Sequence, residues 1–196
     1  MAMLTSPVAL VRVARPRLPD DQKIVLHPLT VLLRALDDKL SYDQRSQVER
    51  EFSPYLNNSY PVLVGNQLID RVCELGLADR PIGEARQLLA TAYMNRYRET
   101  ILGRILGATM PLMKPEWILR GCPRNYASAT NFGTYWVAQL EERHWRFDFE
   151  DDPGYPDWIL GTLSSACQIL RIPAVQISYQ VLAPQHTSFD IRWEAK

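Results

Sequence analysis

Two arginines in the middle of the chain are the side chains best suited to bind an anion. Arg98 and Arg104 lie six residues apart in a segment with helical periodicity, so they belong to different faces of the helix. An arginine held in a protein interior needs an anionic partner, which is either a carboxylate of the protein or a carboxylate or phosphate of a ligand. In the ligand interpretation Tyr97 is a neighbouring contact. The structural alternative is solvent exposure, or pairing with Glu99 or Asp70.

A second polar group falls at the expected junction between a helical part and a sheet part. It consists of Arg124, Asn125, Tyr126 and Asn131. Ligands commonly bind at such junctions, although asparagine and arginine can equally satisfy the backbone groups of a loop. The residues that we assign to a ligand site are Tyr97, Arg98, Arg104 and Asn131.

No combination of residues indicates a catalytic reaction. Ser164 and Ser165 lie inside a helical pattern, without the glycine-flanked turn that exposes a serine nucleophile. The acidic clusters at 141–142 and 150–152 lack the ligand spacing of a calcium loop. Gly103 and Gly107 form a GxxxG pattern, which in a soluble chain favours close helix packing. We therefore do not expect an enzyme, and an enzyme of unrecognised type remains the outlying alternative.

The cysteines and histidines are too scattered along the chain to indicate a metal site. Cys73, Cys122 and Cys167 form no CxxC pattern, and three cysteines cannot complete a disulfide framework. Free thiols packed in a core are expected, as is typical of proteins of the reducing cytoplasm. We expect no metal and no cofactor.

The balance of charges and the lengths of apolar segments argue against nucleic acid as the main partner and against a membrane span, although a local basic patch stays compatible with them. Twenty-two basic residues oppose twenty-two acidic residues, so there is no electrostatic reason to expect nucleic acid as the main partner. The longest weakly charged segment is 101–113, which is shorter than the roughly 20 residues that cross a bilayer. We expect a cytoplasmic protein without a membrane span.

Helical patterns begin after a proline-punctuated start. Residues 1–22 are expected to be irregular, although residues 8–13 could pair as a short edge strand. Residues 29–40 show leucines at helical spacing. Ser41 and Gln44 form a capping-box pattern, which predicts that the next helix begins near residue 42.

Prolines and glycines set the expected limits of the later helices. One helix follows Pro61, and the longest is expected from about residue 84 to residue 110. A short helix is expected over residues 115–120, because Gly121 is well suited to the position after a helix end.

Beyond Pro123 the period changes to two, which predicts strands. Residues 134–140 and 144–150 form one expected hairpin, and residues 175–181 and 189–193 form another. A helix over residues 156–171 separates the two hairpins. The apolar face of the resulting four-stranded sheet should be covered by this helix or by the N-terminal helices. The five tryptophans are expected mostly in the core.

The polar sides of these strands carry several charged residues. A solvated sheet face with cross-strand ion pairs is the simplest interpretation, and docking of a partner or a second copy is the alternative. The residues concerned are His144, Arg146, Asp148, Asp190 and Arg192.

These elements define an α+β fold. A helical N-terminal layer is followed by a four-stranded, mainly antiparallel sheet with one helix between its two hairpins. We expect a single domain over residues 23–196, with a helical part at about 23–125 and a sheet part at about 126–196.

The order of several short motifs resembles a known family. The motifs are Tyr60-Pro61, the run from Tyr97 to Arg104, Pro123 to Tyr126, Thr130 to Phe132, and the ending in Phe189, Ile191 and Trp193. In this order they resemble the uncharacterised paralogous domain family expanded in myxobacteria, over residues 19–194. The C-terminal layout is similar to that of haem nitric-oxide-binding and vinyl-reductase-type domains, which implies a ligand enclosed between helices and a sheet.

The haem-binding members of that group use a histidine on a helix and a tyrosine–serine–arginine motif, and neither pattern occurs here. His27 directly precedes Pro28, while His144 falls on a strand and His186 in a turn. The resemblance therefore implies a ligand-binding fold without haem.

Together these features favour a non-enzymatic small-molecule-sensing or regulatory adaptor module. It would bind a small apolar or anionic ligand, or a protein partner, at the helix–sheet junction. The alternative is a protein-interaction or self-assembly module, such as a homodimer, that binds no ligand.

Overall fold

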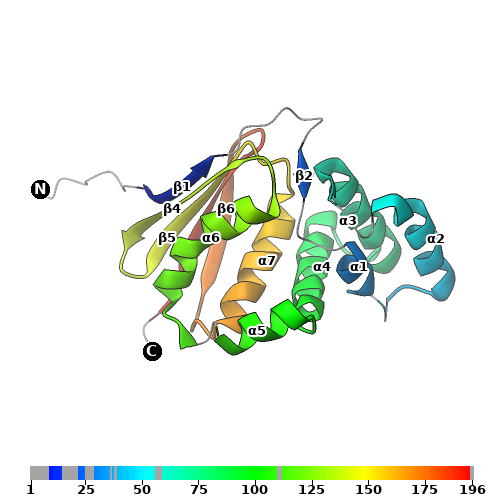
Figure 1. Cartoon of the computed structure of the whole chain (residues 1–196), viewed down its shortest axis with the longest axis horizontal. Helices are drawn as coiled ribbons and strands as arrows, with labels where there is room; N and C mark the ends of the chain where they lie inside the picture. Colours follow the sequence, from blue (N-terminus) through cyan, green and yellow to red (C-terminus); the bar gives the residue numbers. More distant parts are fainter. Residues whose placement is uncertain are drawn as a thin grey trace, which may run out of the picture.

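Helices and a sheet form successive layers in the computed structural model of the chain (Figure 1). The structure describes residues 9–14, 22–24, 29–35, 37, 39–55, 59–109 and 112–194. A five-stranded sheet forms one side, two helices cover one of its faces, and the helices of the first half of the chain pack beyond them.

Four helices make up most of the helical part: α1 (Leu29–Arg34), α2 (Tyr42–Phe52), α3 (Val62–Gly76) and α4 (Ile82–Tyr97). A 3-10 turn, η2 (Ser53–Tyr55), follows α2, and strands β2 (Lys23–Ile24) and β3 (Tyr60–Pro61) form a separate two-stranded ribbon. Among the described residues, no helix is both long enough and apolar enough to span a bilayer.

The start of α2 confirms the capping box. Ser41 accepts a hydrogen bond from the Gln44 backbone N–H at 3.3 Å, and the Gln44 side chain accepts one from the Ser41 N–H at 2.8 Å. Two backbone donors that the helix cannot use are thereby satisfied. The helix expected over residues 29–40 is shorter than predicted, because α1 ends at Arg34.

The long helix expected over residues 84–110 is two helices. It divides into α4 and α5 (Ile101–Thr109), and the backbone N–H groups of Glu99 and Thr100 bond to carbonyls three residues back. The Thr100 hydroxyl donates to the Tyr97 carbonyl at 2.7 Å and accepts from the Gly103 N–H at 3.0 Å. This side chain therefore takes backbone partners and caps the start of α5, which favours a break over a continuous helix.

Helix α6 (Pro115–Ala129) runs nine residues beyond its expected end at Arg120. Gly121 does not terminate it, and Pro123 lies inside it. Buried Ile118, Leu119 and Ala127 pack in the core that faces the sheet. This tertiary packing offsets the hydrogen bond that proline removes from the helix.

The main sheet has the order β1-β4-β5-β7-β6, and all its neighbours are antiparallel. The predicted four strands are present as β4 (Thr134–Glu141), β5 (His144–Glu150), β6 (Gln176–Ala183) and β7 (His186–Arg192), with α7 (Pro156–Ile169) between the two hairpins. The start of the chain adds a fifth strand, β1 (Ala9–Ala14), in a segment expected to be irregular but also considered as an edge strand.

The inner face of the sheet is sealed by α6 and α7. Trp145, Phe147, Phe189 and Ile191 are fully buried there, and the Trp193 side chain is almost fully buried. Strand β6 differs from the expectation, because its apolar residues are half-buried or exposed. It forms the edge of the sheet, where the helices cover it incompletely.

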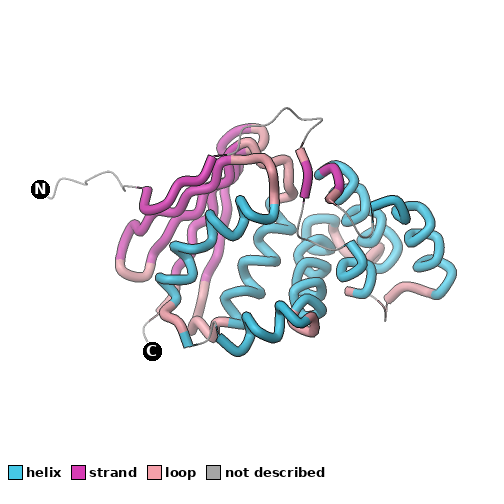
Figure 2. The backbone as a smooth tube through the Cα atoms, in the orientation of Figure 1, coloured by secondary structure: helices cyan, strands magenta, loops and turns pink. Residues whose placement is uncertain are grey.

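The two parts of the chain are joined by direct packing of α4 on α7 (Figure 2). A β-carbon placed on Gly161 of α7 would lie 2.7 Å from the Ala90 β-carbon and 2.7 Å from the Gln87 carbonyl oxygen of α4. Only glycine permits so close an approach of these two helices. Trp158 packs against both hydrophobic cores, so they meet along this contact.

Candidate functional site

A crevice opens where the end of α4, helix α5 and the end of α7 meet. Its narrow inner part has a volume of about 50 Å³, and it adjoins an open groove of about 510 Å³ along α4 and α5. The inner part is lined by Met94, Tyr97, Arg98, Gly103, Gly107, Ala166 and Ile169. The groove is lined by Asn95, Arg98, Glu99, Gly103, Arg104 and Gly107.

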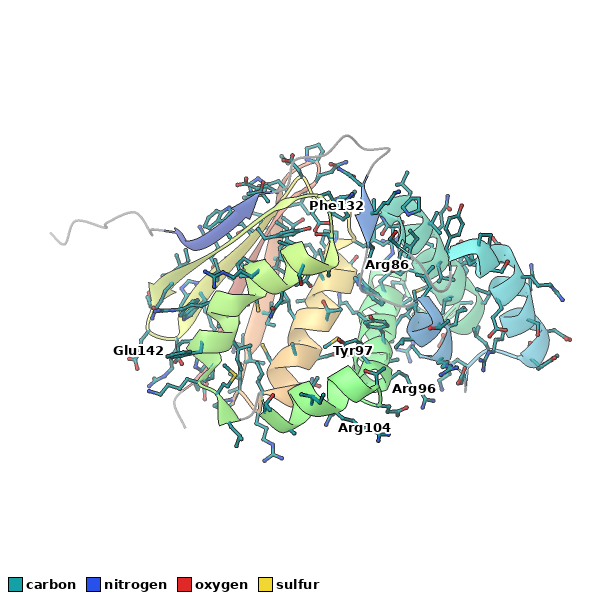
Figure 3. All side chains as sticks on the ribbon, in the orientation of Figure 1. Arg86, Arg96, Tyr97, Arg104, Phe132 and Glu142 are labelled. Atoms are coloured by element: carbon teal, nitrogen blue, oxygen red, sulfur yellow. The ribbon has the colours of Figure 1, made fainter. Side chains whose placement is uncertain are left out.

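Three of the four predicted ligand-site residues meet at this crevice. Tyr97 and Arg98 line its inner part, and Arg98 and Arg104 line the groove outside it. Figure 3 shows Tyr97, the last residue of α4, toward the same end of the molecule as Arg104, which lies on α5. Residues distant in sequence, on α7, complete the crevice, and neither motif nor spacing in the sequence indicated them.

Both arginines are exposed, and neither forms an ion pair with any residue that the structure describes. The carboxylates proposed as their structural partners bind other arginines. Glu99 lies 3.3 Å from the Arg96 guanidinium, and Asp70 accepts hydrogen bonds from Arg86 at 2.8 and 3.0 Å. Of the structural alternatives, exposure is therefore correct and pairing with these two carboxylates is wrong.

Tyr97 supplies an aromatic wall. Its half-buried ring stacks on Tyr93 with centroids 6.2 Å apart, and burial raises the pKa of the Tyr97 phenol. The phenol is therefore neutral at physiological pH and can act as a hydrogen-bond donor. Within the described part of the chain, no side chain forms a hydrogen bond with the Tyr97 hydroxyl.

The GxxxG pattern shapes the floor of the crevice. A β-carbon on Gly103 would collide with the Tyr97 carbonyl and lie 2.7 Å from the Arg98 α-carbon, so α5 rests directly on the end of α4. A β-carbon on Gly107, in contrast, would meet no atom within 4 Å, because this glycine faces the open space. The predicted close helix packing therefore accounts for Gly103, whereas Gly107 leaves open space at the floor of the crevice.

The structure does not bring Asn131 to the crevice. Its side-chain oxygen accepts a hydrogen bond from the Lys23 N–H at 2.6 Å, and its own N–H donates to the Lys23 carbonyl. Phe132, the next residue, lies far from Tyr97 and Arg104 in Figure 3. Asn131 thus joins the loop after α6 to β2, which is the backbone-satisfying role considered as its alternative.

A buried polar network lies at the junction of helices and sheet. The Tyr135 hydroxyl donates to Asp152 at 3.1 Å and contacts Thr130 at 3.2 Å, while the other Asp152 oxygen accepts from the Gly154 N–H at 2.7 Å. Burial raises the pKa of Asp152 and of Tyr135. These buried groups form hydrogen bonds with one another and with the Gly154 N–H, so they stabilise the turn after β5 and do not form an open reaction site.

The outer face of the sheet carries the expected cross-strand pairs. His144 lies 2.7 Å and Arg146 lies 3.7 Å from Asp190. Asp148 is buried instead of solvated, the His186 ring nitrogen lies 3.5 Å from one of its oxygens, and its other oxygen has no hydrogen-bond partner. Burial raises the pKa of Asp148.

The cysteines are free thiols; Cys73 and Cys167 are buried in the interior, and Cys122 is partly buried against the core below the sheet. Burial raises the pKa of each of the three to about 12. In the described ranges, no cluster of three or more histidine, cysteine, aspartate or glutamate side chains could hold a metal ion.

One family model matches most of the chain. The family is described as a protein of unknown function (DUF2378), and the match covers residues 29–194. Among curated protein sequences, none matches this chain significantly.

Solved structures of H-NOX domains share the fold. One is an oxygen-binding H-NOX domain related to soluble guanylate cyclases, with 9% identity, a TM-score of 0.61 and coverage of 85% of this chain and 93% of that chain. A structure concerned with haem redox potential and porphyrin distortion has 9% identity, a TM-score of 0.64 and the same coverages. An Fe(II)CO H-NOX from Shewanella woodyi has 14% identity, a TM-score of 0.61 and coverages of 85% and 92%. At these identities the similarity establishes the fold alone.

Proposed function

This chain belongs to the DUF2378 family of proteins of unknown function, and we propose that it is a non-enzymatic sensing module that binds a small anionic molecule. The observation that carries the proposal is the pair of exposed arginines, Arg98 and Arg104, beside an apolar crevice. A ligand with an anionic head and a short apolar part would place the head between the guanidinium groups and the apolar part against Met94 and Tyr97.

The position of the crevice suits a sensor. Helix α5 is joined to α4 by a turn of three residues, Arg98–Thr100, and rests on it at Gly103. A ligand that enters between α5 and α7 therefore contacts two helices that are far apart in the sequence. Its binding energy can shift α5 relative to the rest of the molecule, as expected of a regulatory module.

The residues present do not fit a haem, although similar structures are haem proteins. His144 and His186 both lie on the outer face of the sheet, beside Asp190 and Asp148, and point away from the helices. Helices α4 and α7 touch at Gly161, and the inner crevice of about 50 Å³ is far too small for a porphyrin. We therefore derive no haem chemistry for the described part of this chain.

Butyrate, which has a carboxylate head and a tail of only three carbons, suits the small apolar crevice as a probe. Isothermal titration calorimetry should detect butyrate binding to the full chain, and Arg98→Gln or Arg104→Gln should weaken it about tenfold, because each removes a charge-assisted hydrogen bond. Arg50→Gln, an exposed change on α2, is the control and should bind as the wild type does. Equal affinity in all four proteins would refute the assignment of the two arginines.

A self-assembly module without a ligand is the second candidate, and strand β6 favours it. This edge strand has eight residues, none of them charged or proline, and exposes Tyr179, Val181 and Leu182. Natural sheets usually protect such edges with charges or prolines. Native mass spectrometry of protein purified from its own host separates the two candidates: a co-purifying small mass supports the sensor, and a bare oligomer supports assembly.

A further inference from the structure

Three large apolar side chains project into solvent at the start of α6. Leu112 is 86% exposed, Met113 is 47% exposed and Trp117 is 70% exposed. Single exposed apolar residues are common on protein surfaces, but three within six residues form a patch that is typical of an interaction site. The core of the fold does not need them, since α6 already packs on the sheet through Ile118 and Leu119.

Basic residues accompany this patch. Lys114, Arg120 and Arg124 are exposed, and the structure gives none of them an ion-pair partner among the residues that it describes. The Arg120 guanidinium lies over the Trp145 ring, 5.8 Å from its centroid, so Lys114 and Arg124 are the cations better placed to bind a partner. Residues 112–124 contain three basic residues and one acidic residue, Glu116, which gives a net charge of +2, whereas the whole chain has a net charge of zero. The apolar patch therefore lies within a locally positive segment of a protein whose net charge is zero.

We infer that this patch, formed by Leu112, Met113 and Trp117 with the neighbouring basic residues, binds the surface of an anionic lipid bilayer. Tryptophan and long apolar side chains partition into the interface between lipid headgroups and acyl chains, and lysine and arginine bind the phosphates around them. The start of α6 lies at the margin of the molecule, next to α5, where a flat bilayer can reach it (Figure 1). Charge complementarity thus favours a membrane surface over an apolar protein groove.

Vesicle co-sedimentation of the full chain tests the inference. The vesicles contain phosphatidylcholine alone, or phosphatidylcholine with about one third phosphatidylglycerol. The wild type should sediment with the anionic vesicles only, and added salt should release it. Trp117→Ala should lower the partition coefficient about tenfold, and Arg124→Gln about fivefold.

Matched controls distinguish this patch from general stickiness. Tyr42→Ala removes an aromatic side chain that is 84% exposed on α2, and Arg50→Gln removes an exposed charge from the same helix; both should bind vesicles as the wild type does. The inference is overturned if the wild type does not sediment with anionic vesicles, if Trp117→Ala binds unchanged, or if the patch instead captures an acidic protein and no lipid. Butyrate binding at the crevice is measured separately, so either result can fail without the other.

Discussion

Replacement of Gly161 by alanine should separate α4 from α7 and destabilise the whole fold. The new β-carbon would lie 2.7 Å from the Ala90 β-carbon, 2.7 Å from the Gln87 carbonyl oxygen and 3.0 Å from the Gln87 α-carbon. Favourable carbon–carbon contacts are about 3.5–4.0 Å, so the helices must move apart by about 1 Å. Two of the three opposing atoms belong to the backbone of α4 and cannot move aside as a flexible side chain would.

The size of the effect follows from two opposing contributions. Overpacking of a core costs about 1–3 kcal/mol, while alanine is favoured over glycine inside a helix by about 0.5–1 kcal/mol. The difference lies between about 0 and 2.5 kcal/mol, so the free energy of unfolding of Gly161→Ala should fall by about 1 kcal/mol, which lowers Tm by about 2–4 °C in a chain of this size.

Urea denaturation followed by both tryptophan fluorescence and circular dichroism measures this change. Gly121→Ala is the control, because a β-carbon there would lie 3.9 Å from its nearest neighbour, the Asn125 side chain, in the middle of α6. It should stabilise the protein by about 0.5–1 kcal/mol through helix propensity alone. Should Gly161→Ala prove as stable as Gly121→Ala, the direct packing of α4 on α7 would be wrong.

Three further predictions concern local features. Ser41→Ala should lower the free energy of unfolding by about 1 kcal/mol in urea denaturation, because it removes the α2 cap; an unchanged midpoint would contradict the role of the capping box. Burial raises the pKa of the Asp148 carboxyl in the folded protein above about 4, its value in the unfolded chain. The wild type therefore loses stability as pH rises above about 4, and Asp148→Asn should gain stability relative to it between pH 4 and pH 7. A difference in urea midpoints that stays constant over this range would refute the prediction. The three thiols, each with a pKa of about 12, should react with a disulfide reagent very slowly at pH 8 in the native state and rapidly in urea; rapid native labelling would show that the thiols are accessible.

Features determined by near neighbours in the sequence could be predicted, and features determined by distant packing could not. The capping box at Ser41 and the alternation of β5 depend on residues a few positions apart, and both are confirmed. The break before α5 depends on the Thr100 hydroxyl, which competes for backbone groups, and the continuity of α6 through Pro123 depends on burial against the sheet. The spacing of apolar residues along the chain predicts neither the break before α5 nor the continuation of α6 through Pro123.

The candidate site shows the same division. Tyr97, Arg98 and Arg104 are close in sequence, and their meeting at one crevice follows from the short turn between α4 and α5. The opposite wall comes from α7, whose place beside α4 is decided by long-range packing at Gly161. Likewise, the exposure of Trp117 was not expected, because most tryptophans at amphipathic positions are core residues.

Strand β1 carries a consequence for the order of events during synthesis. Its residues Ala9 and Ala14 pair with Ala138 and Thr134, so more than a hundred residues must leave the ribosome before this strand finds its neighbour. The contact closes a long loop, which makes it entropically slow to form. Strand β1 is therefore translated long before β4 and is among the last of the described strands to find its place, so a bulky fusion partner attached ahead of it should slow this late step of folding.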